Sequence, residues 1–91
     1  MFSITTPGRL YLSWYAIERG WRVQALDGTP IGTVDEVLGD EELDIFHGLA
    51  VSVGIGRLPR EVSSDLVSSI EQGTVTVAIL ADEIGTLPST R

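Results

Sequence analysis

Apolar and polar residues alternate over residues 21–25, where Trp21, Val23 and Ala25 are separated by two polar residues. Alternation with a period of two is typical of a strand with one buried face and one wet face. The pattern therefore predicts a strand over this segment. Because Trp21 is in phase with Val23, we expect the Trp21 side chain to lie in the core.

An Asp-Gly pair follows this strand at residues 27–28, and a second apolar segment runs over residues 30–38. An Asp-Gly pair between two such segments predicts a β-hairpin, because both central turn positions favour residues that tolerate a positive φ. The alternation in the second segment is imperfect, so we expect a bulge or kink near residues 32–35.

The remaining pattern predicts four more short elements after a polar, acidic loop at residues 39–44. Alternating apolar residues predict a third strand over residues 45–53. A short fourth strand is expected over residues 57–59, where a proline ends it. Apolar residues spaced three and four apart predict an amphipathic helix over residues 63–72, and the last strand is expected over residues 74–80.

Five short strands, one small helix and no strand–helix–strand spacing predict a mainly β fold. We expect a small antiparallel β-barrel with one short helix before the last strand. Residues 1–13 are expected to form a flexible leader, residues 14–82 the domain and residues 83–91 a C-terminal tail. A sheet of this size hides its edges either by closing on itself or by pairing with another chain.

Two runs near the start of the chain resemble a known family. The run GWRV at residues 20–23 and the run DGTPIGTVDEV at residues 27–37 resemble the opening hairpin of PRC-barrel domains. The later segments match in order: an apolar strand at residues 49–53, a short strand that ends at Pro59, a brief helix, and a closing strand after Gly73. The resemblance covers most of the chain.

This resemblance implies a stand-alone bacterial PRC-barrel-like domain, a small β-barrel that serves as a protein-interaction module. Such domains are similar to the cytoplasmic domain of the photosynthetic reaction-centre H subunit and to the C-terminal domain of a ribosome maturation factor. Neither function is expected here, because the chain shows no transmembrane helix and no room for the partner domain of an RNA factor. The family has no shared catalytic residues to carry over.

Composition narrows the classes of function. The chain has 91 residues, 43% of them apolar, and no cysteine, which excludes a disulfide framework and a thiolate metal site. It shows no signal sequence and no run of about 20 apolar residues, so we expect a cytoplasmic protein without a transmembrane segment. The chain has thirteen acidic and six basic residues, and its net charge of −7 disfavours nucleic acid as a partner. All six basic residues are arginines, a composition that suits proteins from GC-rich bacterial genomes.

Four acids of the loop are candidates for a divalent-cation site or a dock for a basic partner: Asp40, Glu41, Glu42 and Asp44. Ca²⁺ prefers several carboxylate oxygens. The loop lacks the alternating Asp-x-Asp-x-Asp-Gly register of a calcium loop. A solvated acidic loop is therefore the preferred interpretation, and no metal ligand or cofactor is assigned.

Trp14 and Tyr15 are the candidates for an interaction surface. Both precede the first strand, and with Trp21 they form an aromatic group expected near the entrance of the barrel. They either pack against the barrel or serve as exposed anchors, because aromatic residues are enriched at the centres of protein interfaces.

The remaining motifs indicate structure rather than chemistry. His47 is the single histidine, which is too few for a zinc site or a triad, and we expect it to be packed or hydrogen-bonded. The Gly54-Ile55-Gly56 segment predicts a turn, because Pro59 stands where a dinucleotide fingerprint needs a third glycine. No pair of carboxylates is singled out for acid–base work, so no catalytic residue is expected.

The sequence therefore predicts a non-catalytic adaptor of PRC-barrel type that binds protein partners and self-associates as a homodimer. The alternative is a regulatory domain that binds a small ligand or a divalent cation through the acidic loop.

Overall fold

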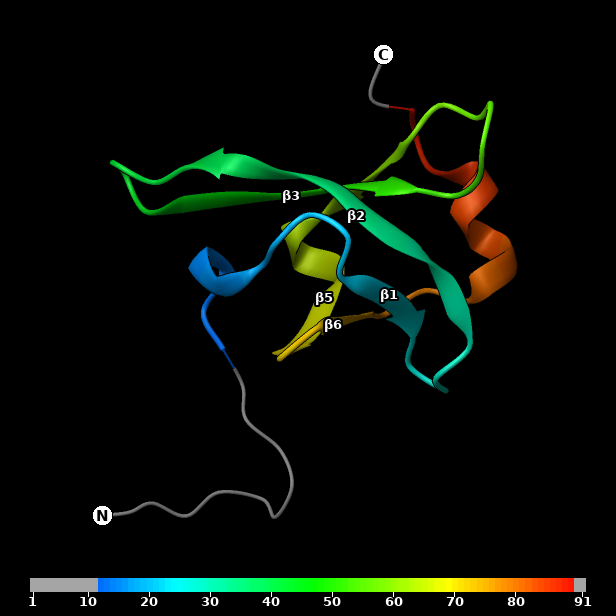
Figure 1. The fold of residues 1–91 in the computed structure, drawn as a ribbon, viewed down its shortest axis with the longest axis horizontal. Helices are drawn as coiled ribbons and strands as arrows, with labels where there is room; N and C mark the ends of the chain where they lie inside the picture. The colour runs from blue at the N-terminus through cyan, green and yellow to red at the C-terminus, as the bar shows by residue number, and fades with distance from the viewer. Residues whose placement is uncertain (1–11, 90–91) are drawn as a thin grey trace.

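The computed structural model describes residues 12–89, and its core is one mixed sheet of six strands (Figure 1). The strands are β1 (Arg22–Ala25), β2 (Pro30–Asp40), β3 (Ile45–Ser52), β4 (Arg60–Ser63), β5 (Val67–Glu71) and β6 (Thr74–Val77). Three short 3-10 helices complete it: η1 (Trp14–Ala16), η2 (Ser64–Leu66) and η3 (Ala81–Thr86). The mainly β fold that the sequence predicts is confirmed. The leader predicted for residues 1–13 lies, as far as residue 11, outside the described residues.

The strand order in the sheet is β4-β3-β2-β1-β6-β5. Neighbouring strands pair antiparallel with one exception, the parallel pair of β1 and β6, in which Arg22 lies opposite Thr74 and Ala25 opposite Val77. The prediction of a purely antiparallel sheet was therefore wrong at this pair. The cause is long-range, because β1 and β6 are far apart in the chain. The direction of β6 is set by its hairpin with β5 and not by a turn that joins it to β1.

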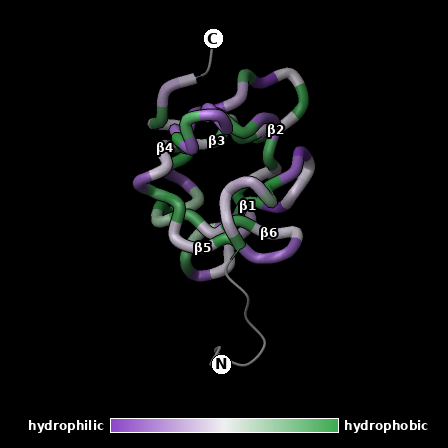
Figure 2. The backbone as a smooth tube through the Cα atoms, turned by 90° about the vertical axis from the view of Figure 1, so that its left-hand side faces the viewer, coloured by the Kyte–Doolittle hydropathy of each residue, from purple (hydrophilic) through white to green (hydrophobic). Residues whose placement is uncertain are grey.

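The sheet is not closed into a barrel, because no ladder joins its edge strands β4 and β5 within residues 12–89. It is instead strongly folded over. Only the short η2 separates β4 from β5 in the chain, and Figure 2 shows β2, β3 and β4 lying above β1, β5 and β6. The closed barrel predicted from the sequence is thus not confirmed, although the two halves of the sheet face each other across one core.

Segments from both ends of the described chain lie on the edge strands. On β4, the Glu61 backbone N–H donates to the carbonyl oxygen of Pro88 at 2.8 Å, and Arg60 forms an isolated bridge with Ser89. On β5, the Leu12 N–H donates to the carbonyl oxygen of Ile70 at 2.8 Å. Unpaired edge groups invite pairing with other chains, and these contacts occupy part of both edges.

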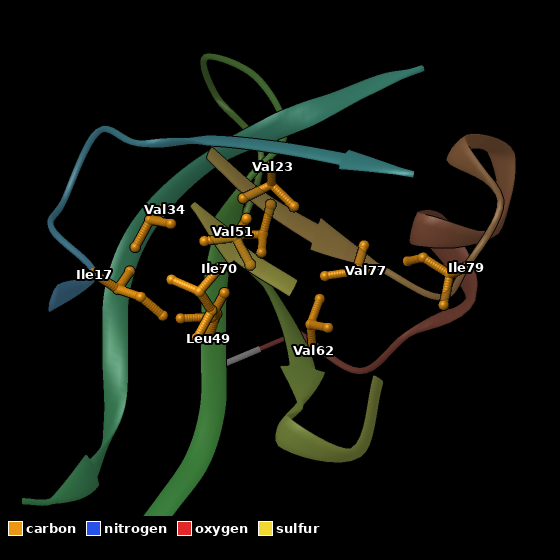
Figure 3. Close-up of a cluster of buried hydrophobic side chains, with 10 residues drawn as sticks. Ile17, Val23, Val34, Leu49, Val51, Val62, Ile70, Val77 and Ile79 are labelled. Atoms are coloured by element: carbon orange, nitrogen blue, oxygen red, sulfur yellow. The ribbon is translucent and has the colours of Figure 1, made fainter. Parts of the chain in front are cut away.

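The core lies between the two halves of the folded sheet and is made almost entirely of β-branched residues (Figure 3). Its buried members are Ile17, Val23, Val34, Leu49, Val51, Val62, Ile70, Val75, Val77 and Ile79. Branched side chains suit a pleated, buried surface because their rotamers are already restricted. No polar residue among residues 12–89 is buried as a whole, so this core is apolar.

The predicted opening hairpin is confirmed. β1 and β2 pair antiparallel around the Asp27-Gly28 turn, in which Gly28 has φ of 88°. Hydrogen bonds from Thr29 to the Asp27 carboxylate fix the turn and lower the pKa of that carboxyl. The register of β2 against β3 shifts between Val34 and Glu36, which places a bulge within the predicted range.

The helix predicted over residues 63–72 was wrong. Residues Val67–Glu71 form strand β5, and only η2 is helical in this segment. The serines and valines here are weak helix formers, and Gly73, with φ of 83°, makes the turn of the β5–β6 hairpin. Pairing with β6 gives the backbone groups of β5 partners along the strand, which an isolated short helix would supply only in part.

The fourth strand predicted over residues 57–59 was also displaced. Residues 53–59 form a loop, and β4 begins at Arg60, directly after Pro59. The end of the chain is more structured than a tail, because η3 forms there and Ile84 and Leu87 pack against the core. None of the helices in the described part of the chain has the length and apolar character needed to cross a membrane.

Candidate functional site

The β2–β3 hairpin extends as a two-stranded arm beyond the rest of the sheet (Figure 1). β1 pairs with β2 only as far as Thr33, and β4 pairs with β3 only from Gly48 onward. The ladder between β2 and β3 nevertheless continues to the pair Asp40 and Ile45. Residues 39–46 therefore have only each other as strand partners, and η1 lies beside this arm.

Three aromatic rings stack where η1 meets the arm. The Trp14 ring stacks on Tyr15 at 4.5 Å between centroids and on Phe46 of β3 at 5.3 Å. Ser13 caps η1, since its hydroxyl oxygen accepts the Tyr15 N–H at 3.1 Å. Ile17, which is buried in the core, follows η1 directly and holds it against the sheet. η1 thus positions both rings.

Gly39 permits this close approach of Trp14 to the arm. A Cβ atom at position 39 would lie 3.1 Å from two carbons of the Trp14 ring and even closer to the carbonyl oxygen of Ile45. Contacts this short force neighbouring atoms to shift. A side chain at position 39 would therefore displace the Trp14 ring from the arm.

One carboxylate of the acidic loop binds both η1 aromatics. The Tyr15 hydroxyl lies 2.8 Å from Asp44 Oδ1 and 3.2 Å from the carbonyl oxygen of Glu41, so the shorter contact to the carboxylate receives its single proton. Trp14 Nε1 donates to the same Oδ1 at 3.3 Å. Asp44 has φ of 55° and is the one non-glycine residue with a positive φ within residues 12–89. Aspartate tolerates this conformation better than most residues.

The loop itself is ordered by Asp40. Its Oδ1 accepts the backbone N–H groups of Glu42 at 3.0 Å and of Leu43 at 3.3 Å. Asp40 thus uses one carboxylate oxygen inside the hairpin, whereas Asp44 uses one to bind η1. The side chains of Glu41 and Glu42 are exposed and make no such bonds.

The aromatic rings and the acids together form one surface, which we call the tip site: Trp14, Tyr15, Asp40, Glu41, Glu42, Asp44 and Phe46. Within the described chain, no arginine pairs with its acids, and the one ion pair near the arm joins Arg19 to Asp35 at 3.8 Å. The hydrogen bond to Asp44, some desolvation and the charges of Asp44, Glu41 and Asp40 raise the pKa of Tyr15. The tip site is therefore negative and partly apolar.

The structure thus unites two sets of residues that the sequence analysis kept apart, the acidic loop and the Trp14–Tyr15 pair. Phe46 was missed, as were the exposed side chains of Leu43 and Ile45. The signal that was available is the run of apolar residues directly after the acids. Apolar residues in an exposed turn cannot pack into the core, so they are candidates for a contact surface.

Three other predicted positions lie outside the tip site. Trp21 is only half-buried against the core and precedes β1, so its expected place in the core is reached only in part. His47 is exposed on β3, and its side chain forms no hydrogen bond within residues 12–89, so the expectation that it is packed or hydrogen-bonded was wrong. The predicted turn around Ile55 is confirmed, since the Arg57 N–H donates to the carbonyl oxygen of Gly54 at 3.2 Å.

The acidic loop was the candidate for a divalent-cation site. No three His, Asp or Glu side chains of residues 12–89 are placed to hold one ion. One carboxylate oxygen of Asp40 is used for hydrogen bonds within the loop, and one of Asp44 for hydrogen bonds to η1.

A shallow depression of about 610 Å³ lies elsewhere, over β1, the start of β2 and the β5–β6 turn. Its lining is Gly20, Arg22, Pro30, Ile31, Gly32, Thr33, Gly73 and Thr74. Arg22 is the single charged side chain there, with no carboxylate or imidazole beside it, so this lining offers no acid–base pair.

The chain was compared with known proteins. No family model matches it, and no curated protein sequence matches it.

Proposed function

We propose that this chain is a non-catalytic protein-interaction module whose contact surface is the tip site. The observation that carries the proposal is the stacked Tyr15, Trp14 and Phe46 rings on a projecting arm, with Tyr15 48% exposed and the neighbouring Leu43 66% exposed. Aromatic side chains give much contact area for little loss of conformational freedom and dominate the energetics of protein interfaces.

The charge of the tip site argues against a second copy of the chain as its partner. Two tip sites in contact would bring eight carboxylates together, four from each copy, and like charges across an interface cost several kcal/mol. The partner proposed for this surface is therefore a different protein whose contacting face is not acidic.

Self-association, which the sequence predicts, is a separate part of the proposal and would use another surface. Both strand edges are partly occupied by the chain's own ends. The exposed apolar residues Ile55 and Leu58 lie in the loop that follows β3, at the opposite end of that strand from the arm. The exposed Leu80 directly precedes η3, which lies at the same end of the sheet as that loop (Figure 1). These three residues are the contacts that we propose for a homodimer.

Membership of the PRC-barrel family is likewise a proposal. It is supported by the β1–β2 hairpin around Asp27-Gly28 and by the order of the later strands. The absence of a ladder between β4 and β5, and a strand where a helix was expected, both depart from the pattern on which the resemblance was based.

Site-specific photocrosslinking in the native host tests the proposed contact surface. A crosslinking amino acid replaces Leu43 at the tip, and a matched control replaces Ile55, which is fully exposed at the far end. We expect one defined protein adduct from position 43 that is absent from position 55 and disappears when Tyr15→Ser is added. Equal adducts from both positions, or none from position 43, would refute a binding role for the tip site.

A further inference from the structure

We infer that the tip site recognises an arginine side chain of the partner, with the guanidinium group stacked on the exposed face of the Tyr15 ring and paired with the carboxylates of Glu41 and Glu42. This inference rests on the proposed function, because it names the chemistry of the partner at the same surface.

Within residues 12–89, the ring stack ends at Tyr15. Trp14 takes part in both stacking contacts, whereas Tyr15 and Phe46 take part in one each, so Tyr15 is a terminal ring. Trp14 and Phe46 are half-buried, whereas Tyr15 is exposed. A guanidinium group over the face of a tyrosine ring is attracted by about 0.5–1 kcal/mol when exposed, and by more once water is excluded.

The position of this ring is fixed before any partner arrives. The Ser13 cap holds η1, and the hydrogen bond from the Tyr15 hydroxyl to Asp44 holds the ring against the loop. Binding to a preformed surface avoids the entropy cost of ordering the side chains that make it. A tyrosine ring that served only to fill space beside the sheet would not require the hydrogen bond from its hydroxyl to a carboxylate.

The neighbouring carboxylates supply the second half of the recognition. Glu41 and Glu42 are exposed, and neither side chain has a partner within residues 12–89. The Glu41 carbonyl oxygen lies 3.2 Å from the Tyr15 hydroxyl, so this loop and the ring share one rim. Carboxylates accept two parallel N–H bonds from a guanidinium group, a geometry that an ammonium group does not offer.

Other partner chemistries fit less well. A metal ion would need converging carboxylates, which the described residues do not provide, and it would leave the aromatic face without a role. A purely apolar partner would cover the carboxylates without pairing them, and burial of unpaired charge is costly. An arginine side chain can stack on the aromatic ring and pair with the carboxylates at the same time.

Titration of the full chain with synthetic peptides tests the inference, with binding measured by calorimetry. Four peptides share one Gly-Ser background and carry three arginines, lysines, citrullines or glutamates. We expect the arginine peptide to bind with a Kd below about 1 mM and about 3- to 10-fold more tightly than the lysine peptide. The citrulline peptide keeps the shape and loses the charge, and it should not bind.

Variants assign the binding to named groups. We expect the double variant Glu41→Gln, Glu42→Gln to bind the arginine peptide about 5- to 20-fold more weakly. The double variant Glu61→Gln, Asp82→Asn removes the same charge from exposed positions elsewhere and should change binding less than about 2-fold. Tyr15→Leu should abolish the preference for arginine over lysine, whereas Tyr15→Phe, which keeps the ring, should retain it.

Each result decides the inference. Equal binding of the arginine and citrulline peptides, no binding of the arginine peptide, or equal losses in the two double variants would overturn it. If a protein adduct forms at position 43 and requires Tyr15, but the arginine peptide does not bind, the proposed function is supported and the arginine inference is refuted. Should both fail, the tip site is not a binding surface.

Discussion

At the scale of single residues, Asp44 is the centre of the tip site. It combines a positive φ of 55° with a carboxylate oxygen that binds the Tyr15 hydroxyl and the Trp14 ring nitrogen. Residues held in sparsely populated backbone conformations cluster at functional sites, where surrounding contacts fix them. Here the fixing contacts come from η1, which is distant from Asp44 in the chain.

The raised pKa of Tyr15 gives a direct test of its contact with Asp44. The folded chain should hold the Tyr15 proton above the ordinary pKa of 10.0, because the hydroxyl donates to a carboxylate. The stability from this contact is therefore complete below pH 10.0 and is lost as the pH rises through the higher folded value. In Tyr15→Phe, this component of the alkaline loss of stability should be absent.

Absorbance titration of ionised tyrosine measures this effect. The chain has two tyrosines, so Tyr11→Phe leaves Tyr15 as the single reporter. We expect a higher pKa in the folded chain than in urea. Equal values in the two states would show that Tyr15 does not contact Asp44 in solution.

At the scale of elements, the strands with clear alternation were predicted well and the segments between them were not. β1 and β6 follow the apolar phase of the sequence, and Val75 and Val77 are fully buried as that phase requires. β5 was missed because its apolar residues also fit a helical spacing. Short apolar runs are ambiguous in this way, since periodicity alone does not separate a strand from a helix.

Val62 tests the placement of β4. It lies in the middle of β4, opposite Leu49, and is 0% exposed. We expect Val62→Ala to lower the free energy of unfolding by about 2 kcal/mol, because it leaves a cavity in a β-branched core. Ile55→Ala, at a fully exposed loop position, should change it by less than about 0.5 kcal/mol.

Chemical denaturation of both variants gives these values. A loss for Val62→Ala no larger than that for Ile55→Ala would mean that β4 does not lie against β3 with Val62 inside. The slope of unfolding against urea should stay the same in both variants, because neither changes how much surface becomes exposed.

At the scale of the whole molecule, the arm and the far end of the sheet differ in charge and in exposed apolar groups. The arm carries the four acids of the tip site. The far end carries Ile55, Leu58 and Leu80, with Arg57 between the first two. In our proposal, this division separates the surface that binds a partner from the surface that joins two copies.

The homodimer proposal is tested by mass in solution. We expect a mass near twice 9.8 kDa for the natural chain and for Leu43→Glu at the tip. The double variant Ile55→Glu, Leu58→Glu should reduce the mass to that of one chain, because each substitution places charge in the proposed contact. A natural chain that stays monomeric at about 100 μM would contradict the proposed dimer.

The sequence by itself determined the local features of this protein. Alternation, the Asp27-Gly28 pair and a set of branched apolar residues were enough to predict a small β domain and its first hairpin, since these signals act between close neighbours in the chain. The acidic loop and the two aromatic residues were also visible as candidate sites.

Only the tertiary structure decided how these parts meet. The parallel pairing of β1 with β6 and the contacts on the two edge strands depend on partners far apart in the chain. The tip site arises in the same way, because Tyr15 and Asp44 are brought to 2.8 Å from positions 29 residues apart. No local pattern encodes such a distance, since it is set by the way the core holds η1 against the arm.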